Sequence, residues 1–355
     1  MNTLIRKLYH IALFLLPYFC YGQDIHFSQI TRAEFQLNPA FTGAFSGNVR
    51  ATFNWKDQWQ SINKTFRTYA SSAEFAFAKG RAQNPTFFAL GLNFYKDVAG
   101  DVEVGNTNVG LNFSTLVRIT RNSRFAAGIQ GAYGSTGLNL ANMQWGSQYS
   151  GLNFDPSLAN GEGTEFKPFS YFDMGLGVAY WYSKNDRNVV QQAPSDGKIG
   201  LAIYHVNKPK FTYSNSNDDR LPMRVVLHAS ALYATQTINL YWYPNFTFVV
   251  QKKQHEVYFG SLWKYNLQSG SRSTGFTNEV SITGGLNARV TNVIDAIVPQ
   301  LFIGAYNFQV GLSYDINVSR LNMASQYRGG FEFSLRFTNP DGYTHRNPFR
   351  SAVSI

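Results

Sequence analysis

The chain has 355 residues and a formal net charge of +10, and only 15% of its residues are charged, whereas ordinary globular proteins carry about 25%. Its single cysteine, Cys20, lies within the first 22 residues, so the chain beyond them has no disulfide, thiolate metal ligand or thiol nucleophile. Lysines and arginines are spread along the sequence rather than gathered in one stretch, which argues against nucleic-acid binding.

Residues 1–22 have the pattern of a secretory signal peptide. Arg6 and Lys7 precede the apolar run LYHIALFLLPYF, which is too short and wrongly flanked for a transmembrane helix. We expect this signal to be cleaved, so that the mature chain begins near Gln23. Loss of Arg6 and Lys7 then lowers the formal charge from +10 to +8.

Residues 23–47, QDIHFSQITRAEFQLNPAFTGAFSG, fit neither a helix nor a strand. Any regular element is interrupted by Asn38, Pro39, Gly43 and Gly47. Four phenylalanines recur without a steady period: Phe27, Phe35, Phe41 and Phe45. Left exposed, these rings would be an aggregation hazard, so the segment has to be buried somewhere.

From residue 48 the dominant pattern is an alternation of period two. In YFDMGLGVAYWY one face carries only large apolar residues: Phe172, Met174, Leu176, Val178, Tyr180 and Tyr182. The other face is rich in small residues, and the pattern returns in 307–317 and 331–337. A soluble β-sandwich also alternates, but its polar face is solvated and rich in Lys, Glu and Thr. Ten residue steps at a tilt of about 40° span roughly 25 Å, the height of a bilayer's apolar band.

The sequence therefore predicts an all-β protein, a transmembrane antiparallel outer-membrane β-barrel. We expect about fourteen strands, over 48–56, 65–79, 86–96, 106–119, 123–134, 169–183, 198–206, 222–234, 236–250, 254–266, 276–289, 292–304, 306–317 and 329–338. The ninth contains Pro244, which is tolerated only at edges or bulges. An even count predicts both termini in the periplasm and the long connections 135–168 and 207–221 outside the cell.

This count divides the chain into a signal peptide (1–22), an N-terminal segment (23–47), one barrel (48–338) and a periplasmic C-terminal tail (339–355). A segment without strand period cannot join the wall, so we expect 23–47 to pack in or under the lumen as a plug. Asn38 should hydrogen-bond to backbone near the periplasmic mouth. The alternative is a flexible periplasmic leader that orders on meeting a partner.

Catalytic and metal motifs are missing from the sequence. It contains no G-x-S-x-G, H-E-x-x-H or P-loop motif, and its histidines lack ligand spacing. We expect no enzyme activity, no cofactor and no metal. The charges expected on the lumen face either line a pore or pair across a filled interior; they are Glu74, Arg118, Asp173, Glu256, Lys264, Asp315, Glu332 and Arg336.

Motifs at both ends of the mature chain carry a family resemblance. FSQ, NPAFTG and RATFNWKDQW resemble the start of the type IX secretion membrane proteins PorP/SprF of Bacteroidetes, through Phe27, Ser28, Gln29, Asn38, Pro39, Ala40, Gly43, Arg50, Gln58 and Trp59. VGLSYDINVSRL and GGFEFSL are similar to the family's closing strands, through Gly311, Ser313, Tyr314, Asp315, Ser319, Gly330 and Glu332. Trp55-Lys56 stands where the family often has Tyr-Arg, which keeps the charge but loses the planar guanidinium.

The resemblance implies an outer-membrane protein that helps to export or anchor a large secreted surface protein, such as an adhesin, through the cargo's C-terminal domain. Periplasmic or lipoprotein components of the secretion system are further expected partners, together with membrane lipid. The alternative is a porin or FadL-like channel for small or hydrophobic solutes, which the strand count and a plug-like segment also fit.

Overall fold

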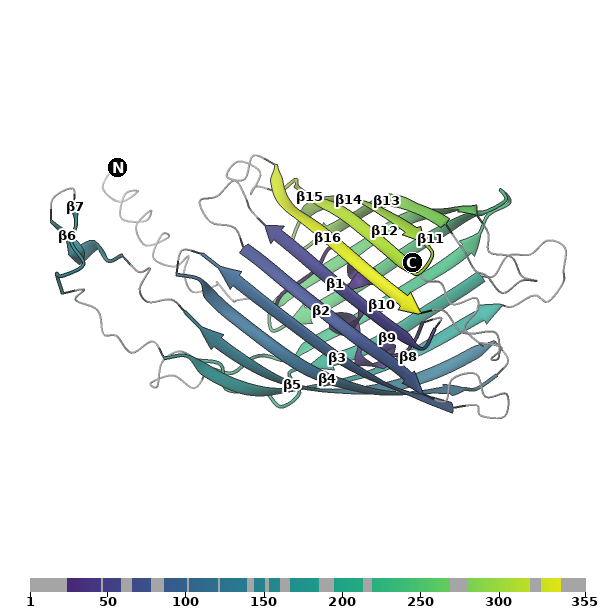
Figure 1. Ribbon diagram of the computed structural model, residues 1–355, viewed down its shortest axis with the longest axis horizontal. Coiled ribbons are helices and arrows are strands. Elements are labelled where there is room, and N and C mark those ends of the chain that lie inside the picture. The colour runs from purple at the N-terminus through teal and green to yellow at the C-terminus, as the bar shows by residue number, and fades with distance from the viewer. Residues whose placement is uncertain are drawn as a thin grey trace, which may run out of the picture.

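The structure, a computed structural model, describes residues 24–45, 47–58, 66–77, 86–100, 102–120, 122–138, 144–150, 153–159, 167–184, 195–212, 219–268, 280–319 and 327–339. Within these ranges fourteen antiparallel strands close into one barrel (Figure 1). The wall strands are β1 (Val49–Gln58), β2 (Phe66–Phe77), β3 (Thr86–Ala99), β4 (Val104–Arg118), β5 (Ser123–Gly137), β8 (Phe169–Lys184), β9 (Ser195–Tyr204), β10 (Arg224–Ala234), β11 (Leu240–Gln251), β12 (Gln254–Gln268), β13 (Val280–Val290), β14 (Ile294–Ala305), β15 (Phe308–Asn317) and β16 (Arg328–Asn339).

The fourteen-strand barrel is confirmed, and its seam lies between the first and last strands. β1 and β16 pair antiparallel from Val49 opposite Asn339 to Gln58 opposite Gly330. The sequence did not predict the short hairpin of β6 (Tyr149–Ser150) and β7 (Asn153–Phe154), which stands apart from the wall in the connection between β5 and β8 (Figure 1).

The predicted faces of the wall are also as the alternation requires. Leu176 is 44% exposed and Val178 42% exposed on the outer surface, whereas Ala179 is 3% exposed and faces the lumen. Large apolar side chains on the outside and small or polar ones inside are what a barrel in lipid needs. No helix in the described ranges is long and apolar enough to cross a membrane.

Pro244 lies in β11 and interrupts one of its two ladders. Pairing with β10 runs to Ser230 opposite Asn245 and resumes at Tyr233 opposite Trp242, so the ladder skips Pro244 and its neighbour. On the other side β11 stays in register with β12 through Pro244 opposite Ser261. Because proline has no N–H to donate, the wall tolerates it as a local gap in pairing.

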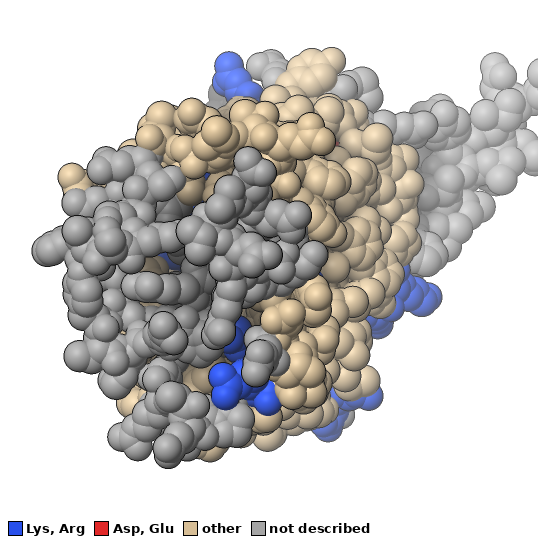
Figure 2. All heavy atoms as spheres, turned by 90° about the vertical axis from the view of Figure 1, so that its right-hand side faces the viewer, with Lys and Arg blue, Asp and Glu red and all other residues tan. Residues whose placement is uncertain are grey.

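The two ends of the barrel differ in their connections. The longest connections, 138–168 and 205–223, both leave the end where β5 and β9 finish. Longer connections of bacterial barrels lie outside the cell, so we take this end as extracellular and the end where β16 finishes as periplasmic. Figure 2 views the periplasmic end, whose described surface shows Lys and Arg side chains but no Asp or Glu.

The segment before β1 lies inside the barrel; we call residues 24–45 the plug. It forms three short turns of helix, η2 (Ile30–Arg32), α2 (Glu34–Leu37) and η3 (Pro39–Phe41), behind the wall in Figure 1. Its four phenylalanines are between 2% and 8% exposed. They pack on small and apolar lumen residues, among them Ala70, Leu116 and Ala179.

Candidate functional site: the plug and its lumenal contacts

The plug runs through the lumen from the extracellular to the periplasmic end. Asp24 contacts His205, which directly follows β9, and Gln251, which ends β11, both at the extracellular mouth. At the other end a Cβ on Gly47 would lie 2.2 Å from the carbonyl oxygen of Asn339, the last residue of β16. The expectation that both termini are periplasmic is therefore wrong for the first described residue. Asp24 lies at the extracellular mouth, and the plug runs from there to the periplasmic end, where β1 begins.

Ser28 and Gln29 are held by β16 and β15 in a set of contacts that we call the Glu332 clamp. The backbone N–H groups of Ser28 and Gln29 donate to the two carboxylate oxygens of Glu332 at 2.6 and 2.8 Å. The Gln29 amide donates to Ser313 Oγ at 3.2 Å and accepts from Ser334 Oγ at 2.5 Å. The FSQ motif thus binds the wall mainly through its backbone and its glutamine amide.

The buried charges next to the Glu332 clamp are paired rather than exposed to a water-filled pore. Lys56 lies 3.0 Å from Glu332 and 3.6 Å from Asp315, and it donates to the carbonyl oxygen of His26 at 3.1 Å. Arg289 donates to Asp315 at 2.9 Å. A buried charge is tolerable only when it is paired, and here the plug backbone completes the pairing.

Asn38 and Pro39 occupy a niche made by three glycines on adjacent strands. A Cβ on Gly128 would lie 2.5 Å from the Pro39 backbone, and one on Gly177 would lie 2.0 Å from Asn38 Oδ1. A Cβ on Gly200 would meet the Asn38 amide nitrogen at 2.7 Å. We call Gly128, Gly177 and Gly200 the glycine niche, because only residues without a side chain leave room for this turn.

Asn38 is hydrogen-bonded to backbone, but in the middle of the lumen. Its amide donates to the carbonyl oxygens of Val178 at 2.9 Å and Leu201 at 3.3 Å, and its Oδ1 caps η3 by accepting from Ala40 N at 2.8 Å. Val178 and Leu201 are interior positions of their strands. The expected place near the periplasmic mouth is wrong, because the glycine niche that admits the turn lies at mid-height.

A cluster of ionic contacts around Arg50, which we call the Arg50 cluster, holds the periplasmic part of the plug. Arg50 donates to both carboxylate oxygens of Glu74 at 2.8 and 2.9 Å and forms an ion pair with Glu34 of the plug. Glu74 also accepts from the backbone N–H of Gly43 at 2.9 Å. Gly43 has φ +78°, and a Cβ there would lie 2.2 Å from the Ala89 Cβ. Both the backbone conformation and the lack of space therefore require glycine at this family position.

The extracellular end of the plug is fixed by a histidine between two carboxylates. His205 Nε2 lies 2.6 Å from Asp24 Oδ2, and its Nδ1 lies 2.9 Å from Asp173 Oδ1. Burial by itself lowers the pKa of an imidazole, but the two carboxylates outweigh it and raise the pKa of His205 to about 9. His205 also holds φ +56°, which is uncommon without glycine. We call this contact the Asp24 latch.

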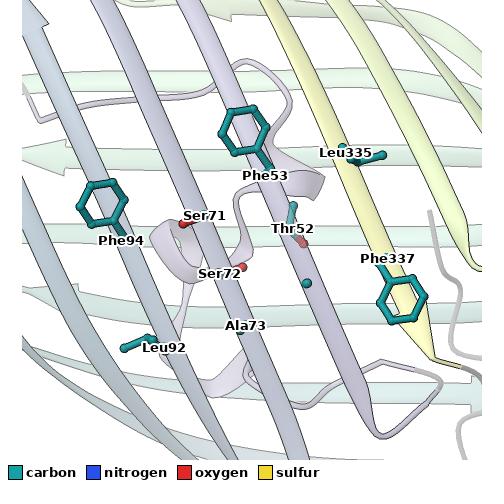
Figure 3. Close-up of a pocket in the computed structure, with 10 residues that line it drawn as sticks. Thr52, Phe53, Ser71, Ser72, Ala73, Leu92, Phe94, Leu335 and Phe337 are labelled. Atoms are coloured by element: carbon teal, nitrogen blue, oxygen red, sulfur yellow. The ribbon is translucent and has the colours of Figure 1, made fainter.

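A small cavity lies beside the plug. This cavity of about 60 Å³ lies between Glu34 of the plug and the periplasmic ends of the wall strands, near Trp181 and Lys198. A hollow of about 350 Å³ lies instead on the outer surface, where small residues of β1 and β2 stand between Phe53, Phe94 and Phe337 (Figure 3). The side chains that ring this hollow point to the lipid, so it is separate from the plug.

The structure brings most of the family-motif residues to the plug contacts. Ser28, Gln29, Ser313 and Glu332 meet in the clamp, and Asp315 lies beside it through Lys56. Tyr314 stands apart from the lumen, 39% exposed on the outer surface, and Gln58 is the last residue of β1. Trp59 lies outside the described residues. Arg118, one of the charges predicted on the lumen face, is instead exposed at the end of β4.

Sequence reasoning missed His205 and the specific role of the three glycines. The repeated glycines of the lumen face, as in MGLG, signalled a close approach of backbone, but not the segment that approaches. His205 carries no local signal, since its partner Asp24 is 181 residues away. In the described part of the chain, no group of three or more His, Cys, Asp or Glu could hold a metal ion.

Solved structures similar to the chain are membrane β-barrels at low sequence identity. A mutant of the TodX monoaromatic hydrocarbon channel has a TM-score of 0.47 at 9% identity, covering 88% of this chain and 94% of that one. The CymD monoaromatic hydrocarbon channel has 0.46 at 11%, covering 90% and 96%. The β domain of the Bordetella autotransporter BrkA has 0.40 at 9%, covering 82% and 99%. Likeness this remote carries no argument about function.

The family comparison is more informative. No curated protein matches the chain. The model of the type IX secretion system membrane protein family PorP/SprF matches residues 19–337, which include the plug and almost the whole wall. The chain therefore belongs to the PorP/SprF family of type IX secretion system membrane proteins.

Proposed function

We propose that this protein helps to export a large secreted surface protein, or anchors it at the cell surface, by binding the cargo's C-terminal domain. The family match over residues 19–337 is the observation that carries the proposal. The protein reaches the outer membrane by a cleaved signal peptide. Periplasmic or lipoprotein components of the secretion system are its further partners, and it has no catalytic activity.

The filled lumen supports an anchor over an open channel. The plug is tied to the wall at both mouths and at mid-height, through the Asp24 latch, the glycine niche and the Arg50 cluster. Lys56 pairs with Glu332 and Arg289 with Asp315 inside the lumen, and Lys56 also donates to the plug backbone, whereas a conducting pore keeps charges in contact with water. A solute channel of this family would have to displace the plug first.

Purification from the native membrane tests this function. The full-length chain with an affinity tag is extracted in mild detergent, and co-purifying proteins are identified by mass spectrometry. A tagged porin from the same membrane is the control. We expect one large exported protein with the chain and not with the porin, and little conductance when the purified chain is reconstituted in planar bilayers. Steady conductance without any exported partner would instead assign the chain to the channels.

A further inference from the structure

A cluster of basic side chains stands at the extracellular mouth beside the first plug residue. The connection after β9 carries Lys208, Lys210 and Arg220, and the two-residue turn between β11 and β12 carries Lys252 and Lys253. All five residues are exposed. We call this cluster the basic ledge.

Contacts between the two connections make the ledge one surface. Lys210 and Arg220 face each other in a β-bridge, and Leu221 N–H donates to the Pro209 carbonyl at 2.9 Å. Gln251, next to the Lys252 turn, donates to the Pro222 carbonyl at 3.4 Å and to the Asp24 carboxylate at 3.3 Å. The ledge and the plug terminus are thus tied to each other.

The contact of Phe211 places the ledge over the mouth of the barrel rather than beside the lipid. Phe211, which lies between the ledge residues of the first connection, packs edge-on against Tyr171 with ring centroids 5.3 Å apart. Tyr171 is 6% exposed, and its hydroxyl donates to Asn106 of β4 at 3.1 Å. Since Phe211 is anchored to a lumen-facing residue, we expect the ledge to face the medium above the barrel instead of lipid headgroups.

The charge of the ledge is strongly one-sided. Asp219 is the one exposed acid among its described neighbours in this connection. Four other exposed cations are described at this end: Arg67 on β2, Lys96 on β3, Arg328 on β16 and Lys167 just before β8. The first three belong to strands on the far side of the barrel order. Lys and Arg are also visible at the periplasmic end (Figure 2), so basic charge alone does not single out the ledge.

Two ledge residues also adopt the left-handed backbone conformation, which five other non-glycine residues in the described ranges share, His205 among them. Lys208 has φ +45° and Lys252 has φ +56°. This left-handed region costs an ordinary residue energy, and glycine or asparagine is the usual choice, above all in two-residue hairpin turns. Two ledge lysines therefore stand at positions where glycine or asparagine would adopt the same backbone conformation at lower energy. Strain of this kind occurs in tight turns and also gathers at functional sites.

We propose that the basic ledge is the docking surface for an acidic face of the secreted partner. The inference rests on the proposed function and assigns the partner's contact a place and a charge. Complementary charge steers association and fixes orientation, and it makes binding sensitive to salt. The ledge also places the partner directly above the plug terminus, through Gln251 and Asp24.

Site-specific photo-crosslinking in living cells tests the contact. A photoreactive phenylalanine analogue replaces Lys253 in one strain and Lys96, the matched exposed lysine of the far side, in another. We expect Lys253 to give an adduct with an exported protein through a peptide rich in Asp and Glu, and Lys96 to give none. Adducts with lipopolysaccharide alone, equal adducts at both positions, or no adduct would overturn the proposal.

A pair of asparagine variants separates docking from folding. Lys208→Asn with Lys252→Asn relieves the left-handed strain, so we expect the unfolding temperature not to fall while recovery of the exported partner drops by about tenfold. Lys96→Asn with Arg328→Asn should leave recovery unchanged. Unchanged recovery in the ledge variant overturns docking at the ledge. Absence of any exported partner even with the unmodified chain would instead overturn the proposed function.

Discussion

Gln29 and Glu332 are 303 residues apart in the chain and are joined by two hydrogen bonds. The Gln29 backbone N–H donates to the Glu332 carboxylate at 2.8 Å, and the Gln29 amide donates to the Glu332 carbonyl oxygen at 3.1 Å. The same carboxylate faces Lys56 across the β1–β16 seam. One side chain therefore holds the plug to the wall and the two edges of the barrel to each other.

Glu332→Gln should destabilise the barrel strongly. The change keeps the shape of the side chain but removes the negative charge that faces Lys56 at 3.0 Å. Both residues are almost fully buried. Breaking one half of a buried ion pair costs about 3–5 kcal/mol. The temperature at which the folded, fast-migrating band is lost on semi-native gels measures this. Glu103→Gln, an exposed carboxylate of the β3–β4 connection, is the control and should change little.

The glycine niche predicts a difference between two glycines of one strand. Gly128→Ala places a methyl group 2.5 Å from the Pro39 backbone, which cannot move aside easily, whereas Gly137 of the same strand has nothing within 4 Å of an added Cβ. Overpacking of this kind costs about 1–3 kcal/mol. We expect Gly128→Ala to lower thermal stability or raise conductance, and Gly137→Ala to do neither. Equal behaviour of the two variants would contradict the plug position.

The Asp24 latch predicts a loss of stability in mild alkali. The pKa of His205 is raised from the ordinary 6.5 to about 9, so its contribution is fully present below pH 6.5 and is lost as the pH rises through about 9. The unfolding temperature should therefore fall between pH 7 and pH 10. His205→Gln, which cannot titrate, should show a flatter profile over the same window. Identical profiles would mean that the latch does not contribute.

The assigned faces of β8 predict opposite tolerance at two nearby positions. Leu176→Arg places a charge on the lipid side near mid-bilayer and should cost about 2–4 kcal/mol. Ala179→Ser adds one hydroxyl on the lumen side and should cost less. Equilibrium unfolding from lipid vesicles measures both, and equal costs would count against the register.

Removal of the plug separates two roles for it. Deletion of 24–44 should lower thermal stability or raise conductance in planar bilayers, because the lumen loses its filler. If the deletion changes neither and abolishes recovery of the secreted partner, the segment acts as a docking peptide instead. Deletion of 340–355, beyond the last wall strand, is the control for a truncation as such.

The wall could be predicted because its signal is local. Each strand is an alternating run, so the predicted segment 169–183 differs from β8 by one residue, and even the proline-containing β11 was placed. The burial of the plug followed from its four phenylalanines. Its direction did not, because direction depends on contacts such as Asp24 with His205, 181 residues apart. The height of Asn38 depends on glycines of three different strands, which no single stretch of sequence relates to one another.

The path of the plug also constrains how the molecule can assemble. Residues 24–45 lie within a wall that closes only when the last strand, β16, pairs with the first, β1. Once that seam is formed, the segment can enter or leave only lengthwise through a mouth, against the Asp24 latch at one end and the Arg50 cluster at the other. We therefore expect the plug, which is made before every wall strand, to be in place before the latest-made strand docks. Glu332, on that last strand, would then meet Ser28 and Lys56 in the same closing step.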